Sequence, residues 1–175
     1  HLNWTLREVT AHFPEDLLAR ANVMAWRSAK AATKKHQYQF QEVLNSKLPI
    51  LSVSYDAFMT ERGKKAVWDL MKKRRLLYVA DESTRIKTPG AKRTMSIVRS
   101  ATHCPYRRIL TGTPVTNGPF DAYTQMKFVD ENFWRPLGIT TAAEFRTMFG
   151  IFEEDFVQRG GQLQSFQRCV GYKNI

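Results

Sequence analysis

The chain alternates between short apolar runs and longer segments with helical spacing of apolar residues. The short runs, at residues 22–27, 50–54, 76–80 and 106–110, have the length and composition of strands buried in a parallel sheet. Residues with helical spacing fall between and after them, and they predict helices at 3–12, 34–46, 61–73 and 91–102, one from Phe120 and one after Thr141. Strands and helices that alternate in this order indicate an α/β fold with a parallel sheet between helices.

Several helix boundaries carry local signals. Thr33 is the candidate N-cap of the helix at 34–46, and Thr60 or Glu61 begins the helix that ends at Lys73. Thr141 with Glu144 has the spacing of a capping box. Gly63 weakens the first turn of the helix at 61–73. Gly160-Gly161 interrupts the last segment, for which no element is predicted.

Polar residues follow the third and fourth predicted strands at the point where each strand ends. Asp81 and Glu82 come directly after the third strand, and Thr111-Gly112-Thr113-Pro114 follows the fourth. Ligands of open α/β sheets bind beyond the carboxyl ends of the strands, so both segments belong to a candidate site. A pair of adjacent carboxylates suits magnesium-dependent phosphate chemistry, in which one holds the ion and the other orients water. Glycine permits a positive φ and a close backbone approach, and the two threonines offer hydroxyls.

These two segments resemble motifs of the Swi/Snf-like helicase-related ATPases. Asp81 to Lys87 is similar to the extended Walker B box of that family, D-E-x-H-R-x-K-N. Leu110 to Pro114, followed by Asn117, is similar to its third motif, L-T-G-T-P-x-x-N.

Further segments follow the order of the family's motifs. Residues 3–9 with 12–14 resemble the segment after motif Ia, and Ser54-Tyr55-Asp56 resembles the short motif Ib. Residues 130–134, Phe145 and Phe149 resemble the run after motif III. Order and spacing agree from Asn3 to Phe149, which is most of the chain.

The resemblance implies a motor ATPase that moves along double-stranded DNA, built on a RecA-like parallel sheet sandwiched by helices. ATP and Mg²⁺ would be its cofactors, and a second RecA-like lobe of the same protein would complete the site. The residues implied are catalytic Asp81 and Glu82, with Asp81 also holding the metal; nucleotide-binding Thr111, Gly112 and Thr113; and nucleic-acid-binding Ser54, Tyr55, Arg85 and Lys87.

The chain departs from the family pattern in two respects. Thr84 stands where the box has histidine, and Thr88 where it has asparagine. In addition, no G-x-x-x-x-G-K-[ST] loop occurs in the sequence. We therefore expect residues 1–150 to be part of the first lobe, lacking its amino-terminal P-loop strand, and residues 151–175 to lead toward the second lobe. Such a fragment alone should be inactive and poorly stable, with sheet surface uncovered.

Simpler interpretations remain open for several of these residues. Thr111 and Thr113 are either couplers between nucleotide and nucleic acid or plain turn residues. Arg85 and Lys87 either contact phosphates or anchor the loop through nearby carboxylates. Tyr55 after a predicted strand is consistent with packing as well as with a backbone contact.

Charge supports a polyanionic partner. The 175 residues carry 27 Lys and Arg against 16 Asp and Glu, a formal net charge of +11, which favours nucleic acid. The run Lys72-Lys73-Arg74-Arg75 is equally consistent with phosphate contacts and with a solvated helix end. The two cysteines have no metal or disulfide spacing, and no apolar run approaches a membrane span. We expect an intracellular protein, in the cytoplasm of a bacterium or a phage-infected host.

Two other functions compete with the motor. A degenerate lobe that binds DNA or a protein without hydrolysis would explain Thr84 and the absent P-loop, but would not need Asp81 and Glu82. Another superfamily-two enzyme is less compatible with Arg85, Lys87 and Asn117.

Overall fold

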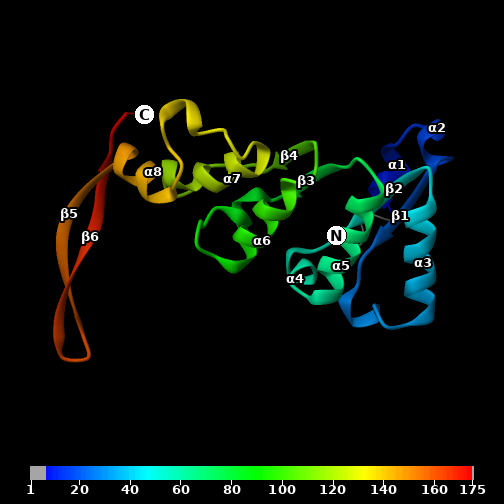
Figure 1. Ribbon diagram of the computed structural model, residues 1–175, viewed down its shortest axis with the longest axis horizontal. Helices are drawn as coiled ribbons and strands as arrows, with labels where there is room; N and C mark the ends of the chain where they lie inside the picture. Colours follow the sequence, from blue (N-terminus) through cyan, green and yellow to red (C-terminus); the bar gives the residue numbers. More distant parts are fainter. Residues whose placement is uncertain (1–6, 175) are drawn as a thin grey trace. The chain divides into compact units, whose positions relative to one another are not determined.

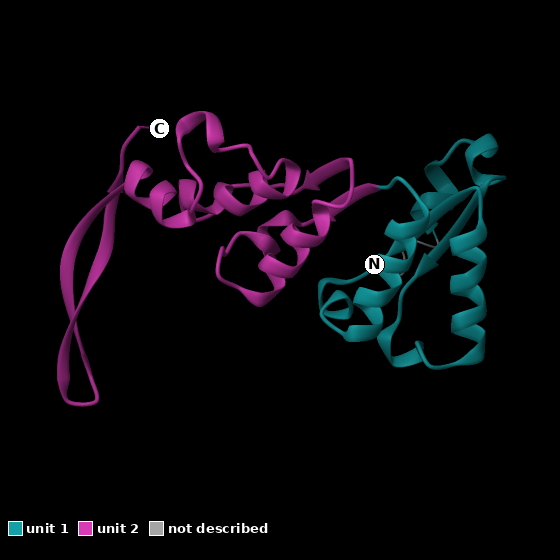
Figure 2. Cartoon of the chain, viewed as in Figure 1, with its two compact units in different colours: residues 1–76 teal, residues 77–175 magenta. Residues whose placement is uncertain are grey.

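The computed structural model describes residues 7–174 and divides the chain into two compact units, residues 1–76 and 77–175 (Figure 2). Each unit is described by itself. The predicted cap at Asn3 and the motif residues 3–6 lie outside the described residues. The division expected at residue 150 remains a prediction.

The first unit contains a parallel strand pair with its crossover helix (Figure 1). β1 (Ala21–Ala25) pairs with β2 (Leu48–Ser52), and α3 (Lys34–Asn45) connects them. The remaining helices are α1 (Val9–His12), α2 (Glu15–Leu18), a 3₁₀ turn at Ser28–Lys30, α4 (Tyr55–Phe58) and α5 (Glu61–Lys73). Helices α2 and α4 were not predicted, because four residues are too few to establish a hydrophobic period.

The core of the first unit lies between α3, α5 and the strands. Its buried residues are Met24, Phe40, Val43, Leu44, Ala66 and Leu70. The predicted cap at Thr33 is confirmed, because its hydroxyl accepts the His36 N–H. Of the two residues predicted to begin α5, Thr60 is the N-cap, and its hydroxyl accepts the Gly63 N–H. A Cβ at position 63 would lie 1.9 Å from the Ala57 carbonyl oxygen, so glycine permits a close approach that outweighs its poor helix propensity.

The second unit repeats the strand–helix–strand arrangement and ends in a hairpin (Figure 1). β3 (Leu77–Asp81) pairs in parallel with β4 (Tyr106–Leu110), with Leu77 opposite Tyr106 and Asp81 opposite Leu110. The other elements are η3 (Ser83–Ile86), α6 (Lys92–Ala101), η4 (Pro119–Asp121), α7 (Ala122–Val129), η5 (Arg135–Leu137), α8 (Ala142–Phe149), β5 (Gly150–Arg159) and β6 (Gln162–Tyr172).

Helix α7 is the centre of packing in the second unit. Phe128 is fully buried, and its ring meets Tyr78 of β3 edge to face at 5.1 Å between centroids. An aromatic cluster around Tyr123, Trp134 and Phe145 joins α7 to α8. The capping box predicted at the start of α8 is confirmed, with the Thr141 hydroxyl accepting the Glu144 N–H and the Glu144 carboxylate accepting the Thr141 N–H.

The long antiparallel hairpin of β5 and β6 was not predicted. Gly160 and Gly161 form its two-residue turn with φ of 59° and 80°, the positive values that a tight hairpin turn requires. The sequence shows this turn as a Gly-Gly pair, but the flanking strands mix apolar and polar residues without regular alternation.

The mixed α/β composition and the parallel pairing are therefore confirmed, as small two-stranded sheets flanked by helices. A complete RecA-like sheet remains a prediction. Among the described residues, no helix combines the length and apolar composition needed to cross a membrane.

The prediction that the strand before Asp81 is buried on both faces is wrong. Leu77, Val79, Tyr106 and Leu110 point to one face of the β3–β4 pair, and each is between 41% and 58% exposed. The opposite face carries Tyr78, which packs against α7. Within the second unit, helices thus cover only one face of this pair.

The uncovered face should make the chain prone to aggregation. Replacing both Val79 and Leu110 with threonine keeps strand propensity and removes apolar surface, so it should slow aggregation measured by light scattering while leaving the circular dichroism spectrum unchanged. The control, Ile109→Thr, alters the covered face and should instead lower the free energy of unfolding by about 1–3 kcal/mol. Equal aggregation of the double variant and the unchanged chain would contradict this prediction.

Candidate functional site

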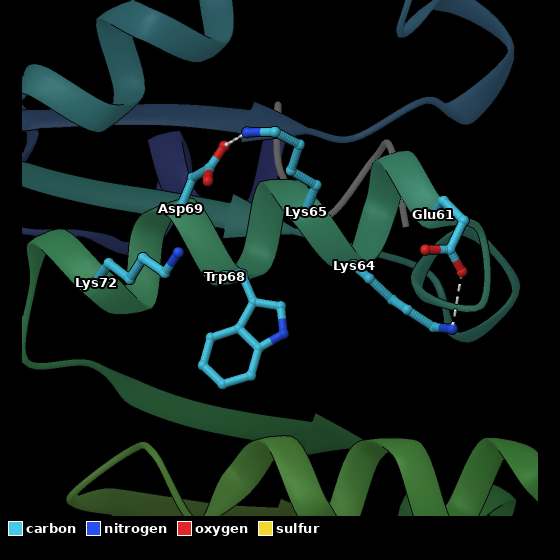
Figure 3. A pocket seen from close by; sticks show the side chains of 6 residues that line it. All are labelled: Glu61, Lys64, Lys65, Trp68, Asp69 and Lys72. Carbon is cyan, nitrogen blue, oxygen red and sulfur yellow. Dashed lines mark hydrogen bonds and ion pairs between the residues drawn. The ribbon is translucent and has the colours of Figure 1, made fainter.

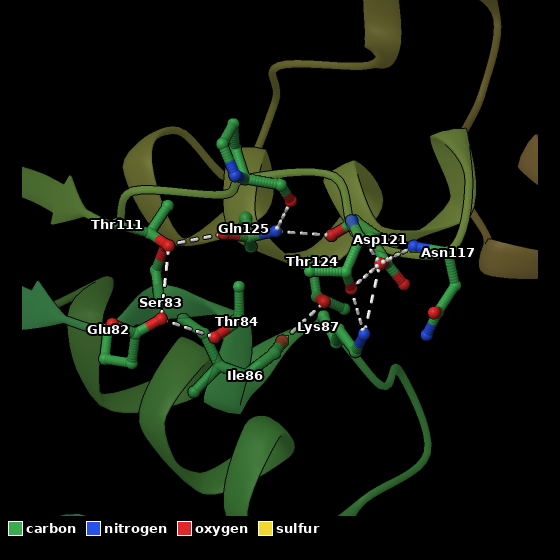
Figure 4. Close-up of polar contacts among 12 residues, drawn as sticks. Glu82, Ser83, Thr84, Ile86, Lys87, Thr111, Asn117, Asp121, Thr124 and Gln125 are labelled. Atoms are coloured by element: carbon green, nitrogen blue, oxygen red, sulfur yellow. Dashed lines mark hydrogen bonds and ion pairs between the residues drawn. The ribbon is translucent and has the colours of Figure 1, made fainter.

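The two polar segments predicted to form a site lie side by side at the carboxyl ends of β3 and β4. Because Asp81 is opposite Leu110 in the parallel register, Glu82 and Thr111 are the first residues beyond the paired strands. The Thr111 hydroxyl donates a hydrogen bond to Glu82 Oε1 at 3.3 Å (Figure 4). The acidic pair and the Thr-Gly-Thr-Pro turn therefore share one edge of the sheet.

Glu82 has an unusual backbone conformation. Its φ of 51° and ψ of 57° lie in the left-handed region, which costs a residue with a Cβ about 1–2 kcal/mol. Its N–H donates to Asp81 Oδ1 at 3.0 Å, and its Oε1 also accepts the Thr84 hydroxyl at 2.8 Å. Thr84 thus contacts the Glu82 carboxylate, for which a catalytic role stays a prediction.

The turn after β4 is stabilised from within. The Thr113 N–H donates to the Thr111 hydroxyl at 3.3 Å, a local turn contact. The φ of Gly112 is not positive, and a Cβ there would meet nothing within 4 Å. Gly112 and Thr113 are exposed, and Thr111 is half-buried.

A buried glutamine connects both segments to α7. Gln125 is completely buried, and its Oε1 accepts the Ser83 hydroxyl at 2.5 Å. Its Nε2 donates to the carbonyl oxygens of Pro114 and Asp121, each at 2.7 Å (Figure 4). One side chain therefore ties the loop after Glu82 to the turn after β4.

A second contact of α7 supports the same loop. The hydroxyl of Thr124, which is also buried, donates to the Ile86 carbonyl oxygen at 2.6 Å. Ser83 and Ile86, the first and last residues of η3, are both buried and both held by consecutive residues of α7. The loop after the acidic pair is consequently fixed at two points.

Asp121 forms the other connection. Its Oδ2 accepts the N–H groups of Thr116 and Asn117, the Thr116 hydroxyl and the Lys87 ammonium, at 2.7–3.1 Å. Burial by itself would raise the pKa of Asp121. The hydrogen bonds from Thr116, Asn117 and Lys87 outweigh burial and lower the pKa to about 2.

Lys87 and Arg85, the two basic residues that follow the acidic pair, differ in their surroundings. Lys87 Nζ lies 2.5 Å from the Thr116 hydroxyl and 3.1 Å from Asp121 Oδ2, so it anchors the loop. Arg85 is exposed on the protein surface. The geometry favours anchoring for Lys87, whereas contact of Arg85 with phosphate stays a prediction.

Ser54 and Tyr55 belong to the first unit, whereas the residues above belong to the second. The Ser54 hydroxyl accepts the Ala57 N–H at 3.1 Å and caps α4, and Tyr55 is half-buried at the start of that helix. Ser54 therefore has a structural role within its own unit.

The described residues contain no group of three or more potential metal-ligating side chains. Magnesium nevertheless fits Asp81, because it is commonly held by one or two carboxylates together with substrate phosphates and water. Asp81 is an exposed, hard oxygen ligand at the end of β3. It would be one protein ligand of such an ion.

Four residues of this network, Thr116, Asp121, Thr124 and Gln125, were not predicted from the sequence. Asp121 and Gln125 are four residues apart and lie on one face of a helical segment, next to Thr124. Polar residues at positions where α7 should be apolar were a signal that this face contacts other polar groups. The sequence did not indicate which ones.

Comparison with known proteins gives one partial similarity. The chain is 33% identical over 69 residues to the "Defense against restriction protein B" of Escherichia phage P1. The match covers 38% of this chain but 3% of the phage protein, so the chain spans a small fraction of that relative's length. No protein-family profile and no solved structure matches.

Acid should weaken the second unit through Asp121. Its pKa is about 2 when folded and 3.8 ordinarily, so its carboxylate stabilises the fold above pH 4 by about 2 kcal/mol, and this contribution is lost as the pH falls toward 2. Asp121→Asn should reduce stability at pH 7 and flatten its dependence on pH between 5 and 2. Urea unfolding followed by amide NMR signals of residues 77–174 measures both.

Glu61→Gln provides the control, because Glu61 is 91% exposed and belongs to the first unit. It should leave the pH dependence of those signals unchanged. An unchanged profile for Asp121→Asn would show that the network around Asp121 does not stabilise the unit.

Proposed function

We propose that the chain is part of the first lobe of an ATP-dependent motor that moves along double-stranded DNA. The observation that carries the proposal is the hydrogen bond between Glu82 and Thr111, which joins the ends of two neighbouring parallel strands. Ligands of parallel sheets bind at such an edge, and the motifs resemble those of Swi/Snf-like ATPases.

In this proposal Glu82 orients the attacking water and Asp81 holds Mg²⁺, which supplies charge neutralisation for the phosphates when bound. Thr111, Gly112 and Thr113 face the nucleotide from the neighbouring strand. Because Glu82 Oε1 accepts two hydroxyls, its carboxylate is oriented before substrate arrives. Prior orientation of this kind lowers the reorganisation needed during reaction.

The motor requires parts that these 175 residues do not include. No Gly-rich loop with Lys-Ser/Thr occurs in the sequence, so the phosphate cradle and the second lobe must come from other regions of the same protein. The partial similarity to a much larger phage protein fits a chain that works as a small part of a long polypeptide.

That similarity also suggests a setting. The relative's name describes defence against restriction, a process that acts on DNA, and the net charge of +11 favours a nucleic-acid partner. We infer that the complete protein acts on DNA during phage infection.

A lobe that binds DNA without hydrolysis is the second candidate. It is favoured by Thr84, because a hydroxyl now contacts the carboxylate where the family has an imidazole. A measurement of ATP hydrolysis by the complete protein separates the two candidates.

Glu82→Gln in the complete protein should lower the turnover of DNA-stimulated ATP hydrolysis by about 10²–10⁴-fold, since an amide cannot accept the proton of the attacking water. ATP binding should be retained, because the amide keeps the size of the side chain. Phosphate release and equilibrium nucleotide binding are the measurements. Glu153→Gln, an exposed residue of β5, is the matched control and should leave turnover unchanged.

Retained hydrolysis in Glu82→Gln would remove this carboxylate from the mechanism. No hydrolysis even in the unchanged complete protein would favour the binding lobe instead.

Arg85 and Lys87 should respond differently to replacement. Arg85→Ala should lower the slope of log K against log salt for duplex DNA by about 0.9, the loss of one phosphate contact. Lys87→Ala should leave that slope nearly unchanged and lower the free energy of unfolding by about 1–2 kcal/mol, because Asp121 loses a partner. Salt titrations of DNA binding and urea unfolding test both. Equal slopes for Arg85→Ala and the unchanged protein would leave Arg85 without a role in DNA binding.

A further inference from the structure

The base of the β5–β6 hairpin is bonded to the segment that follows the Thr-Gly-Thr-Pro turn. Tyr172, the last residue of β6, donates its hydroxyl hydrogen to the Asn117 carbonyl oxygen at 2.9 Å. Asn117 is the final residue of the motif that begins at Leu110. In the proposed function this motif faces the nucleotide, whereas the hairpin has no role.

Gly118 allows the tyrosine to approach this closely. Its φ of 142° and ψ of 174° are a backbone conformation that is almost confined to glycine. A Cβ at this position would overlap the Tyr172 hydroxyl oxygen. Any other residue at position 118 would therefore push the tyrosine away from Asn117.

Aromatic packing holds both strands of the hairpin beside η4. The Phe120 ring of η4 meets the Tyr172 ring edge to face at 5.5 Å between centroids, and it stacks on Phe152 of β5 at 6.2 Å. The Arg146 guanidinium of α8 lies 4.9 Å from the Phe120 centroid and 5.2 Å from that of Phe152. Phenylalanine at position 172 would keep the ring contacts and lose the hydroxyl alone.

Asn117 is the residue at which the hairpin meets the network of the candidate site. Its N–H donates to Asp121 Oδ2 at 2.9 Å (Figure 4), while its carbonyl oxygen accepts the Tyr172 hydroxyl. The same Asp121 oxygen accepts the ammonium of Lys87, which lies in the loop after Glu82. The hairpin is thus connected to both loops at the carboxyl ends of β3 and β4.

The bond from Tyr172 differs from contacts made within a single element. On α5, for example, Lys65 pairs with Asp69 one turn along the same helix (Figure 3). Such a pair supports only the helix that contains it. Tyr172 and Asn117 are 55 residues apart in the sequence, so their bond fixes one segment of the second unit against another.

We propose that Tyr172 is a positioning residue of the candidate site, by which the hairpin fixes the Thr-Gly-Thr-Pro turn and, through Thr111, the Glu82 carboxylate. This inference rests on the proposed function, in which Glu82 acts in hydrolysis. The Thr111 hydroxyl is one of two that Glu82 Oε1 accepts, so a turn that moves would leave the carboxylate less well oriented. Because Glu82 orients the attacking water in the transition state, poor orientation should lower kcat and leave KM nearly unchanged.

The first test is Tyr172→Phe in the 175-residue chain. The amide groups of Thr116 and Asn117 both donate to Asp121, so their hydrogen exchange reports the opening of the segment after the turn. Exchange at both amides should become about 2- to 10-fold faster, as expected for the loss of one hydrogen bond. This measurement involves no ATP.

The second test is the same variant in the complete protein. Tyr172→Phe should lower the kcat of DNA-stimulated ATP hydrolysis by about 2- to 10-fold, with the KM for ATP changed by about twofold at most. A merely structural role would lower the free energy of unfolding and leave the kcat of the folded protein unchanged.

Tyr123→Phe is the matched control. It removes another tyrosine hydroxyl of the second unit, which donates to the Thr140 carbonyl oxygen just before α8 at 3.2 Å. The two variants lose the same chemical group and the same type of bond. Tyr123→Phe should therefore leave kcat and the exchange of the Thr116 and Asn117 amides unchanged.

Three outcomes would overturn the proposal. Exchange as slow in Tyr172→Phe as in the unchanged chain would show that the hydroxyl does not hold the turn. Equal effects of Tyr172→Phe and Tyr123→Phe would show that the position of the lost bond does not matter. Faster exchange with an unchanged kcat would separate the turn from hydrolysis. If Glu82→Gln retains hydrolysis, the proposed function fails by itself, and the exchange result still decides whether Tyr172 positions the turn.

Discussion

The buried amide of Gln125 is the constraint on which the candidate site depends. A primary amide without water must have its polar atoms paired, or it costs free energy comparable to a lost hydrogen bond. Here its oxygen accepts one hydroxyl and its nitrogen donates to two carbonyl oxygens. Because those partners come from η3, the turn after β4 and η4, none of the three segments can shift without leaving a buried polar atom unpaired.

These contacts connect the loop after Glu82 rigidly to the Thr-Gly-Thr-Pro turn. Asp121 joins the same segments a second time through Lys87 and Thr116, and its low pKa shows that the carboxylate is the form the network requires. A displacement of the Thr-Gly-Thr-Pro turn would therefore be transmitted to the loop after Glu82. Such a link is what a motor needs between nucleotide and nucleic acid, although the same contacts also serve stability alone.

The sequence predicted the elements that depend on local chemistry. The caps at Thr33 and Thr60, the box at Thr141, and strand β4 follow from side chains within four residues of each boundary. It also predicted that Glu82 and Thr111 share an edge, since parallel strands align their carboxyl ends. It failed where the outcome depends on distant partners: the face of β3 left uncovered, the hairpin of β5 and β6, and Gln125, whose three partners are spread along the chain.

The polar groups of the candidate site are exposed, and this favours a site that is incomplete within these residues. Asp81, Glu82 and Gly112 are exposed, and charges in water are screened too strongly to stabilise a transition state by much. Enzymes overcome this by closing the site against water. By contrast, two of the supporting contacts, Ser83 with Gln125 and Thr124 with Ile86, are buried. Exposed carboxylates on a rigid scaffold are compatible with the proposed function, in which another part of the protein would close the pocket.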